Sequence, residues 1–375
     1  MTRIESVELT DSSVPLHTPF VTALRRTETV DTLIVQVHDS DGRTGWGEAP
    51  QVWQVTGESL AGARACIETM LAPTVVGSAL DRPEDLDVVT TRVQRSVARN
   101  FGAKAALDAA LHDLLAQELS TTVSGVLAGA ASGIPSTVLT DVTLSAGEAD
   151  GLAATGRQRV AEGFTTLKLK VGTQASTDVA RVRAVREAVG PDVAIRLDAN
   201  QGWSREEAVE VIRALEDAGL DIEFVEQPVV AEDVEGLAWV RARVGLPIMA
   251  DEACYGMWDL ERIIRLGAAD LVNIKLAKCG SLALGAAMLR RAHDAGLGTI
   301  VGSMMESHVG VAAAAALVAA VPTTCVSDLD AAWWSVHSPV EGGIAYEGNR
   351  VRLPEGPGFG IAGLSQELSA AAPAR

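Results

Sequence analysis

The sequence predicts an α/β protein: a (β/α)8-type barrel with an N-terminal α+β capping domain that the C-terminal tail completes. From about Thr137 the chain alternates short apolar segments with helical patterns such as REEAVEVIRALEDAG, which is the repeat of a parallel β/α barrel. The residues before it begin instead with a hairpin pattern. A chain of 375 residues also exceeds the size at which one hydrophobic core stops growing, so a second, smaller domain is expected.

The N-terminal part reads as a hairpin followed by helices. TLIVQVHDSDGRTGWGEAP places two apolar segments around an Asp-Gly turn, a pattern typical of β-hairpins. GESLAGARACIETMLAPTVVG and NFGAKAALDAALHDLLAQEL then show helical periodicity. We therefore predict a capping domain over residues 1–125.

The middle of the chain, residues 126–332, supplies the predicted barrel. Residues 333–375 contain EGGIAYEGNRVRLP, which looks like a further hairpin and is expected to return to the capping domain. The predicted barrel strands are TVLTDVTLS, TTLKLKVG, VAIRLDAN, DIEFVEQP, PIMADE, LVNIKLA, GTIVGS and TCVSDL.

Charge and composition narrow the class of protein. The chain has 31 basic and 49 acidic residues and a formal net charge of −18, which argues against nucleic acid or an anionic membrane as the main partner. The start, MTRIESVELTDSS, lacks a signal-peptide pattern, so none is expected. The apolar run VGVAAAAALVAAV is shorter than the about 20 residues that cross a bilayer and predicts a buried helix. Thiols in a reducing, cytoplasmic compartment are expected, because no metal-type spacing joins Cys66, Cys254, Cys279 and Cys325.

Two lysines occupy alternate positions of the predicted strand TTLKLKVG. Lys168 and Lys170 therefore share one face of that strand. For an isolated pair the simpler interpretation is a solvated edge strand, because lysine is almost never fully buried unless it is paired. The ends of the following strands favour a functional site.

Three successive predicted strands end in a carboxylate: Asp198 in RLDAN, Glu226 in FVEQP and Asp251 in MADE. All three would lie at the C-terminal rim, where such barrels place their active sites. Each one alone could cap a helix or form a rim ion pair. Together they are hard oxygen ligands that suit Mg²⁺, and we predict one ion per subunit.

The next strand, LVNIKLA, carries Lys275, so lysines flank the predicted metal on two sides. If a substrate carboxylate binds the cation, removal of its α-proton develops negative charge that the cation stabilises. A lysine base needs its pKa lowered from about 10.4 towards about 7–8, and repulsion from Lys168 and the cation would lower the pKa of Lys170. We assign Lys170 and Lys275 as acid and base on opposite faces, and Lys168 as the neighbour that contacts the substrate carboxylate. Such a pair inverts a stereocentre.

These motifs, together with the lysine in NIKLAK, resemble the muconate lactonizing enzyme subgroup of the enolase superfamily over nearly the whole chain. The resemblance implies one of several reactions. Members racemise N-acylamino acids, epimerise dipeptides, cycloisomerise muconate or form o-succinylbenzoate by dehydration.

Two further motifs distinguish these reactions. VSDLDAAWW contains Asp328 and Asp330, which resemble the DxD that dipeptide epimerases use for the substrate α-ammonium group; a paired carboxylate site prefers a cation. A helix cap or a solvated loop is the alternative for these acids. PFVTALRRT resembles the mobile cap segment of L-Ala-D/L-Glu epimerases, with Arg25, rather than Arg26, as the residue that holds a side-chain carboxylate.

Other features leave the substrate side chain open. GSMMES would bring Met304, Met305 and Glu306 towards the substrate. The turn after Lys278 reads CGS where members often have GG. Three tryptophans have two possible positions: Trp53, Trp333 and Trp334. If they line the pocket, they would favour a larger or more apolar second residue in the dipeptide. The alternative is that they pack between the cap and the barrel.

The sequence thus predicts an Mg²⁺-dependent dipeptide epimerase that acts at the C-terminal residue of a small dipeptide, with L-Ala-D/L-Glu as the leading substrate. An N-acylamino acid racemase or o-succinylbenzoate synthase is the alternative within enzymes. A non-catalytic barrel that binds a carboxylate ligand is the alternative from another class. We expect a homo-oligomer with neither nucleic acid nor membrane as a partner.

Overall fold

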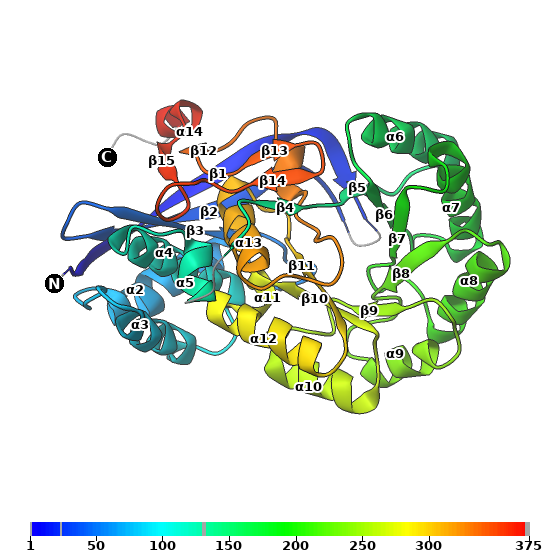
Figure 1. The fold of residues 1–375 in the computed structure, drawn as a ribbon, viewed down its shortest axis with the longest axis horizontal. Helices are drawn as coiled ribbons and strands as arrows, with labels where there is room; N and C mark the ends of the chain where they lie inside the picture. The colour runs from blue at the N-terminus through cyan, green and yellow to red at the C-terminus, as the bar shows by residue number, and fades with distance from the viewer. Residues whose placement is uncertain (1, 23–24, 130–132, 372–375) are drawn as a thin grey trace.

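The computed structural model of the chain describes residues 2–22, 25–129 and 133–371. Figure 1 shows two regions next to each other, a long antiparallel sheet with helices near the N-terminus and a curved parallel sheet with helices around it. The predicted fold class, an α/β protein with an N-terminal cap and a barrel-like parallel sheet, is confirmed.

The N-terminal sheet is antiparallel, with strands in the order β1 (Ile4–Val21), β2 (Arg26–Asp39) and β3 (Thr44–Pro50). The predicted β2-β3 hairpin is confirmed. Gly42 in its turn has a φ of 80°, the left-handed region that favours glycine. The helical segments that follow are α1 (Leu60–Cys66), the π-helical η1 (Ile67–Leu71), α2 (Ala72–Val75), α3 (Pro83–Ser96), α4 (Phe101–Glu118) and α5 (Val123–Ala128).

Helix α4 lies directly on β3 because glycines at the contact leave room for its backbone. A Cβ atom on Gly45 would lie 2.1 Å from the carbonyl oxygen of Ala110. A Cβ atom on Gly47 would lie 1.8 Å from that of Ala106. Any side chain at either position would therefore push the helix off the sheet.

Two buried aspartates on α4 join the cap to the rest of the molecule. The Oδ1 atom of Asp108 accepts a hydrogen bond of 2.8 Å from the backbone N–H of Leu282, which lies in the barrel region. Asp113 accepts bonds of 2.9 Å from the N–H of Trp46 on β3 and of 2.7 Å from the N–H of Phe359 in the tail. One helix thus holds three separate parts of the chain together.

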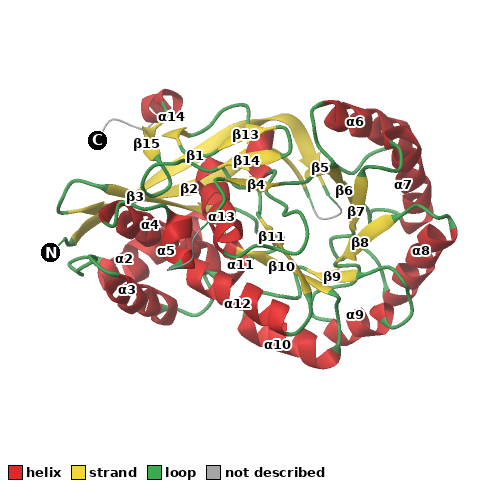
Figure 2. Ribbon diagram, viewed as in Figure 1, coloured by secondary structure: helices red, strands yellow, loops and turns green. Residues whose placement is uncertain are grey.

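The barrel region contains a parallel sheet in the order β11-β10-β9-β8-β7-β6-β5. Its helices lie on the outer face, as Figure 2 shows, and its inner face surrounds the site described below. The strands are β5 (Val142–Leu144), β6 (Thr166–Lys170), β7 (Ala194–Asp198), β8 (Ile222–Glu226), β9 (Ile248–Ala250), β10 (Leu271–Lys275) and β11 (Gly298–Gly302). The helices are α6 (Ala149–Ala161), α7 (Ala175–Val189), α8 (Arg205–Asp217), α9 (Val234–Arg241), α10 (Met257–Leu266), α11 (Leu276–Cys279), α12 (Leu282–Asp294) and α13 (His308–Ala320).

Two predicted strands differ from the structure. TVLTDVTLS is not one strand, since β4 (Thr137–Leu139) pairs antiparallel with β14 (Arg350–Arg352) and only β5 enters the parallel sheet. TCVSDL is not a regular eighth strand. Only two bridges close the sheet there, Ser327 with Thr140 and Asp328 with Gly302, because the chain turns into the short 3₁₀ helix η2 (Ala331–Trp334) directly afterwards.

The tail returns across both regions. The predicted hairpin is confirmed as β13 (Ala345–Glu347) and β14 (Arg350–Arg352), with β4 as its third strand. Val340 of β12 (Val340–Gly342) packs with Ile34 and Trp46 of the N-terminal sheet, and so do residues of β15 (Ile361–Leu364) and α14 (Gln366–Ala371). The exact division at residues 125 and 332 stays a prediction.

Other expectations concern single segments. The apolar run from Val309 to Val321 forms most of the buried helix α13, as predicted. In the described part of the chain, no helix has both the length and the apolar character that a membrane span needs. The cysteines are free thiols, as predicted: Cys66, Cys254, Cys279 and Cys325.

Candidate active site

The two lysines of β6 are buried and paired, so the solvated edge strand is excluded. The Lys168 ammonium contacts a side-chain oxygen of Asp328 and lies 3.2 Å from Glu226 Oε2 and 3.6 Å from Asp198 Oδ2. Lys170 Nζ lies 2.6 Å from the same Asp198 oxygen. Two like charges are tolerated on one strand face because several carboxylates meet them.

The three strand-end carboxylates are neighbours in the sheet. Asp198 pairs in register with Glu226, and Asp251 follows directly after β9. All three side chains are buried. Burial raises the pKa of Glu226, and the negative charges of Asp198 and Asp251 raise it further, which shows that the carboxylates crowd one another.

Unpaired polar atoms lie around these carboxylates. Asn200 Oδ1, Glu252 Oε2 and Asn273 Oδ1 are buried and have no hydrogen-bond partner. Buried polar atoms without a partner indicate a missing water, ion or ligand. Because the neighbouring donors are hard carboxylate oxygens, the residues present fit a divalent cation such as Mg²⁺.

Lysines from β10 and α11 complete the charge balance. Lys275 Nζ lies 2.8 Å from Asp251 Oδ2, and the Lys278 ammonium contacts both Oδ1 and the main-chain oxygen of Asp251. Burial alone would lower the pKa of Lys275, but Asp251 and other acids outweigh it and raise the pKa. The same holds for Lys168, whose acidic partners raise its pKa well above the usual value. Acidic neighbours therefore outweigh burial in setting the pKa of both Lys168 and Lys275.

Two acids after β11 and one directly before β5 form a second cluster. One side-chain oxygen each of Asp141, Asp328 and Asp330 lie within 4.8 Å of one another. Asp330 Oδ2 accepts bonds of 2.7 Å from Thr143 N–H and 3.0 Å from the Trp334 indole N–H. Asp330 directly precedes η2, but its side chain makes no capping bond, so it is not a helix cap in the usual sense. The cluster is thus three buried carboxylates, of which Asp328 and Asp330 also line the cavity described next, and it could hold a cation.

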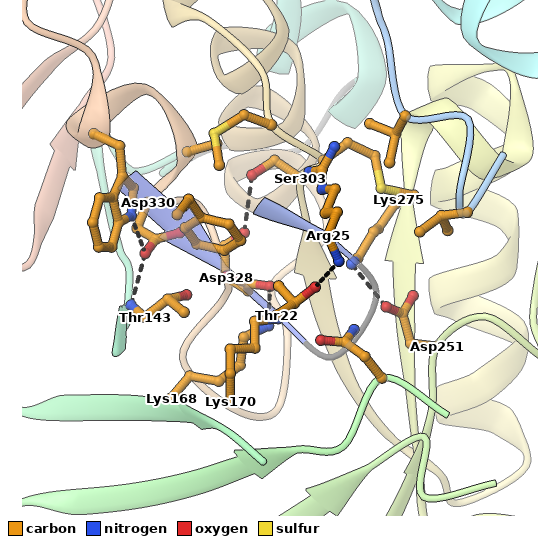
Figure 3. A pocket seen from close by; sticks show the side chains of 18 of the residues that line it. Thr22, Arg25, Thr143, Lys168, Lys170, Asp251, Lys275, Ser303, Asp328 and Asp330 are labelled. Atoms are coloured by element: carbon orange, nitrogen blue, oxygen red, sulfur yellow. Dashed lines mark hydrogen bonds and ion pairs between the residues drawn. The ribbon is translucent and has the colours of Figure 1, made fainter. Parts of the chain in front are cut away.

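One cavity brings these groups together, and Figure 3 shows the labelled side chains that converge on it. Asp198 and Glu226 are not among its lining residues, because Lys168 and Lys170 cover them. From the barrel it is lined by Thr143, Lys168, Lys170, Asn200, Asp251, Glu252, Lys275, Ser303, Met304, Met305, Asp328, Asp330, Ala331 and Trp334, and from the cap by Phe20, Thr22, Arg25, Val52 and Val55.

The cap contributes Arg25, as predicted. Within the described part of the chain its guanidinium has no ion-pair partner, and burial lowers its pKa. The adjacent Arg26 differs, since it is exposed and pairs with Glu28 at 2.9 Å. Arg25 is therefore the arginine that is placed to meet an anionic group in the cavity.

Glu306 lies outside this cavity, unlike the neighbouring Met304. It is buried, its Oε1 atom accepts a 2.8 Å bond from the N–H of Met304, and it lines a separate small cavity with Glu48. Burial and then the charge of Glu48 raise the pKa of Glu306 to about 8. The structure does not bring Glu306 to the substrate side, because the chain turns towards α13 after Met305.

The tryptophans have three different positions. Trp334 lines the main cavity, whereas Trp333 packs against His17 and Phe164 outside it. Trp53 is 61% exposed and lines a neighbouring cavity together with Arg25. Of the three, only Trp334 in the main cavity and Trp53 in the neighbouring one are placed to limit the size of a bound side chain.

Several residues that contact the predicted site residues are not themselves predicted from the sequence. Asn273 donates a 2.7 Å bond to Glu226 Oε1, and Arg196 pairs with Asp141 at 2.9 Å. The sequence indicates Lys278 only as the start of an unusual turn. For Asn273 a signal existed, because it lies two residues before Lys275 and so shares its strand face.

Two family models match the chain. The model described as mandelate racemase / muconate lactonizing enzyme, N-terminal domain, matches residues 4–128. The model described as enolase C-terminal domain-like matches residues 151–365.

Individual relatives cover almost the whole chain. L-Ala-D/L-Glu epimerase from Bacillus subtilis is 37% identical over 97% of this chain and 98% of its own, and a substrate-liganded structure of it superposes with a TM-score of 0.93. Hydrophobic dipeptide epimerase from Enterococcus faecalis is 37% identical over 96% of this chain and 99% of its own. Its structure with Mg and the dipeptide L-Leu-L-Tyr has a TM-score of 0.90. N-succinyl-L-Arg/Lys racemase from Bacillus cereus is 32% identical over 96% of this chain and 95% of its own.

Proposed function

The chain belongs to the mandelate racemase / muconate lactonizing enzyme family of the enolase superfamily, and we propose that it is a dipeptide epimerase that inverts the α-carbon of the C-terminal residue, with L-Ala-D/L-Glu as substrate. One observation carries the proposal: Lys170 and Lys275 reach one cavity from strands that lie apart in the sheet, and the Asp328-Asp330 pair lines the same cavity.

Asp198, Glu226 and Asp251 would hold one Mg²⁺ per subunit. When bound, the ion would stabilise the negative charge that develops on a substrate carboxylate as the α-proton leaves. Lys168 lies beside these ligands and would contact the same substrate carboxylate. A cation held by these carboxylates would offset part of the negative charge that raises the pKa of Lys275 and would so favour the neutral, basic form of the lysine.

The two catalytic lysines would work on opposite faces of the α-carbon. One takes the α-proton, and the other returns a proton to the far face, so the configuration is inverted. Starting from the other enantiomer, the two lysines exchange roles. The chain thus needs one neutral and one protonated lysine at the start of each turnover.

The remaining contacts define the substrate. Asp328 and Asp330 would bind its α-ammonium group, which a free dipeptide has and an N-acylamino acid lacks. Arg25, which has no ionic partner in the described chain, would hold the glutamate side-chain carboxylate in a bidentate manner. Met304 would pack against the aliphatic part of that side chain. Glu306 is not included, since it lines a different cavity.

The test is deuterium exchange. The purified protein is incubated with Mg²⁺ in D₂O with L-Ala-L-Glu, with dipeptides that have apolar or cationic second residues, and with N-succinylamino acids, and deuterium at the α-carbon is followed by mass. Exchange in L-Ala-L-Glu is expected. Exchange only in other dipeptides would overturn the glutamate assignment.

The same experiment separates the other candidates. The 32% identity to an N-succinyl-L-Arg/Lys racemase favours N-acylamino acids as the second candidate, and exchange only in N-succinylamino acids would select it. If no compound exchanges, the remaining candidate is a non-catalytic barrel that binds a carboxylate ligand. We further propose that the chain is a cytoplasmic homo-oligomer, which sedimentation and cell fractionation test.

A further inference from the structure

Gly302 is the last residue of β11 and pairs in parallel register with Lys275 of β10. It is buried. Its φ is not in the positive region, so its backbone conformation is one that any residue adopts in a strand. The reason for glycine at this position is therefore space.

That space is occupied by two side chains of the proposed site. A Cβ atom on Gly302 would lie 2.8 Å from Lys275 Cε, and 2.7 and 2.9 Å from Asn273 Oδ1 and Nδ2. Ordinary contacts between carbon atoms are about 3.5–4.0 Å. The Lys275 stem and the Asn273 amide thus cross directly over the glycine.

Both side chains are fixed at their far ends. Lys275 Nζ, one bond beyond Cε, lies 2.8 Å from Asp251 Oδ2, and Asn273 Nδ2 lies 2.7 Å from Glu226 Oε1. A lysine stem is flexible, so the fold can absorb an added methyl group by moving Cε. The amine at its end would then move too, and that amine is the reacting group.

We infer that Gly302 is a positioning residue for Lys275: the missing Cβ defines the path along which the lysine reaches the α-carbon. This inference rests on the proposed epimerase function. A misplacement of about 1 Å can slow a reaction by about 10²-fold. A side chain at position 302 therefore slows proton transfer on the Lys275 face more than on the Lys170 face.

The experiment compares the two faces in one protein. Initial rates of α-hydrogen exchange in D₂O are measured with Mg²⁺ for L-Ala-L-Glu and L-Ala-D-Glu separately. Lys275→Ala identifies the enantiomer whose exchange needs Lys275. For Gly302→Ala we expect exchange of that enantiomer to fall by about 10-fold or more. Exchange of the other enantiomer should stay within about 2-fold of the rate in the unmodified enzyme. The ratio of the two exchange rates should therefore change, whereas a general loss of structure would lower both rates and leave their ratio the same.

Gly298→Ala is the matched control on the same strand. Its Cβ would meet Leu271 at 2.8 Å, a contact as close as the one at Gly302 but with an apolar side chain. We expect Gly298→Ala to leave the ratio of the two exchange rates unchanged, whatever it does to stability.

Equal slowing of both enantiomers by Gly302→Ala, or no slowing, would overturn the inference. If Gly302→Ala does not fold, two double variants are compared, Lys275→Ala/Gly302→Ala and Asn273→Ala/Gly302→Ala, because each removes one of the two side chains that the methyl group would meet. Recovery of folding with Lys275→Ala supports the inference, and recovery only with Asn273→Ala, or with neither, overturns it. Absence of exchange with every dipeptide in the unmodified enzyme would instead overturn the proposed function itself, and the inference with it.

Discussion

Lys278 and Lys275 bind different oxygens of Asp251. The Lys278 ammonium contacts one side-chain oxygen and the main-chain oxygen of that residue, while Lys275 contacts the other side-chain oxygen. Lys278 is fully buried and also donates a 3.0 Å bond to the carbonyl of Asn273. The loop that presents Asp251 is therefore tied to β10 and α11 through one amine.

Replacement of Lys278 by methionine should destabilise the fold by about 3 kcal/mol, because it leaves a buried carboxylate and two carbonyls with fewer partners. Urea unfolding measures this. Arg262→Met is the control, since it removes an exposed ion pair with Glu235 and should cost about 1 kcal/mol or less. Equal losses in the two variants would contradict the structural role of Lys278.

Removal of either lysine that we propose as catalytic should stop inversion without abolishing all exchange. Lys170→Ala and Lys275→Ala should each lower epimerisation by at least about 10²-fold, the lower range for loss of a general acid or base. Each should still exchange one of the two enantiomers, because the opposite lysine remains. Polarimetry and mass measure the two quantities. Near-normal epimerisation in either variant would argue against two bases.

Asp328→Asn should weaken the binding of a free dipeptide by about 10-fold or more, because a charged hydrogen bond contributes about 1.5–3 kcal/mol. N-acetyl-L-Ala-L-Glu, which has no ammonium group, is the matched ligand, and its inhibition constant should change much less. Equal losses for the two ligands would remove the ammonium assignment of Asp328.

Arg25→Met should raise KM for L-Ala-L-Glu by about 10-fold or more and leave that for L-Ala-L-Leu nearly unchanged, since only glutamate offers a side-chain carboxylate. The neighbouring Arg26→Met is the control, because Arg26 is exposed and paired with Glu28. A similar effect of both substitutions on both substrates would point to a general effect of the cap segment.

Asp113 should make stability depend on pH. Burial raises its pKa from 3.8 to about 7, although hydrogen bonds from Phe359 and Trp46 oppose the shift. The folded state therefore binds the proton more tightly than the unfolded state. The stabilisation from this group is present below pH 3.8 and is lost as the pH rises through about 7.

The variant Asp113→Asn isolates this contribution. The difference in unfolding free energy between the unmodified chain and the variant should fall by about 2 kcal/mol between pH 5 and pH 8. Urea unfolding at both pH values measures the difference. A difference that grows with pH would show that Asp113 is stabilised as the anion.

Much of the site could be predicted because it repeats with the β/α unit. Asp198, Glu226 and Asp251 end successive strands, so their spacing along the chain places them side by side in the sheet. The eighth strand could not be predicted in this way, since its pairing amounts to single bridges at Ser327 and Asp328. Its apolar pattern resembles that of a full strand.

Contacts between distant segments left no pattern in the sequence. Asp141 joins the Asp328-Asp330 cluster only because the barrel closes between its first and last segments. Glu306 follows two methionines in one motif, yet the turn into α13 directs it into another cavity. Position along the chain does not reveal on which side of such a turn a side chain lies.

The buried aspartates of α4 restrict how the enzyme can open. Asp113 ties the helix to β3 and the tail within the cap, and Asp108 ties it to the backbone at Leu282 in the barrel region, so a hinge rotation of the cap would break the buried bond to Leu282. We therefore expect opening to be local to the cap residues that line the cavity, among them Arg25, Val52 and Val55, while the sheet behind them stays in place. On the proposed function, we expect the rate of substrate exchange to respond to substitutions of these cap residues and not to changes between the domains.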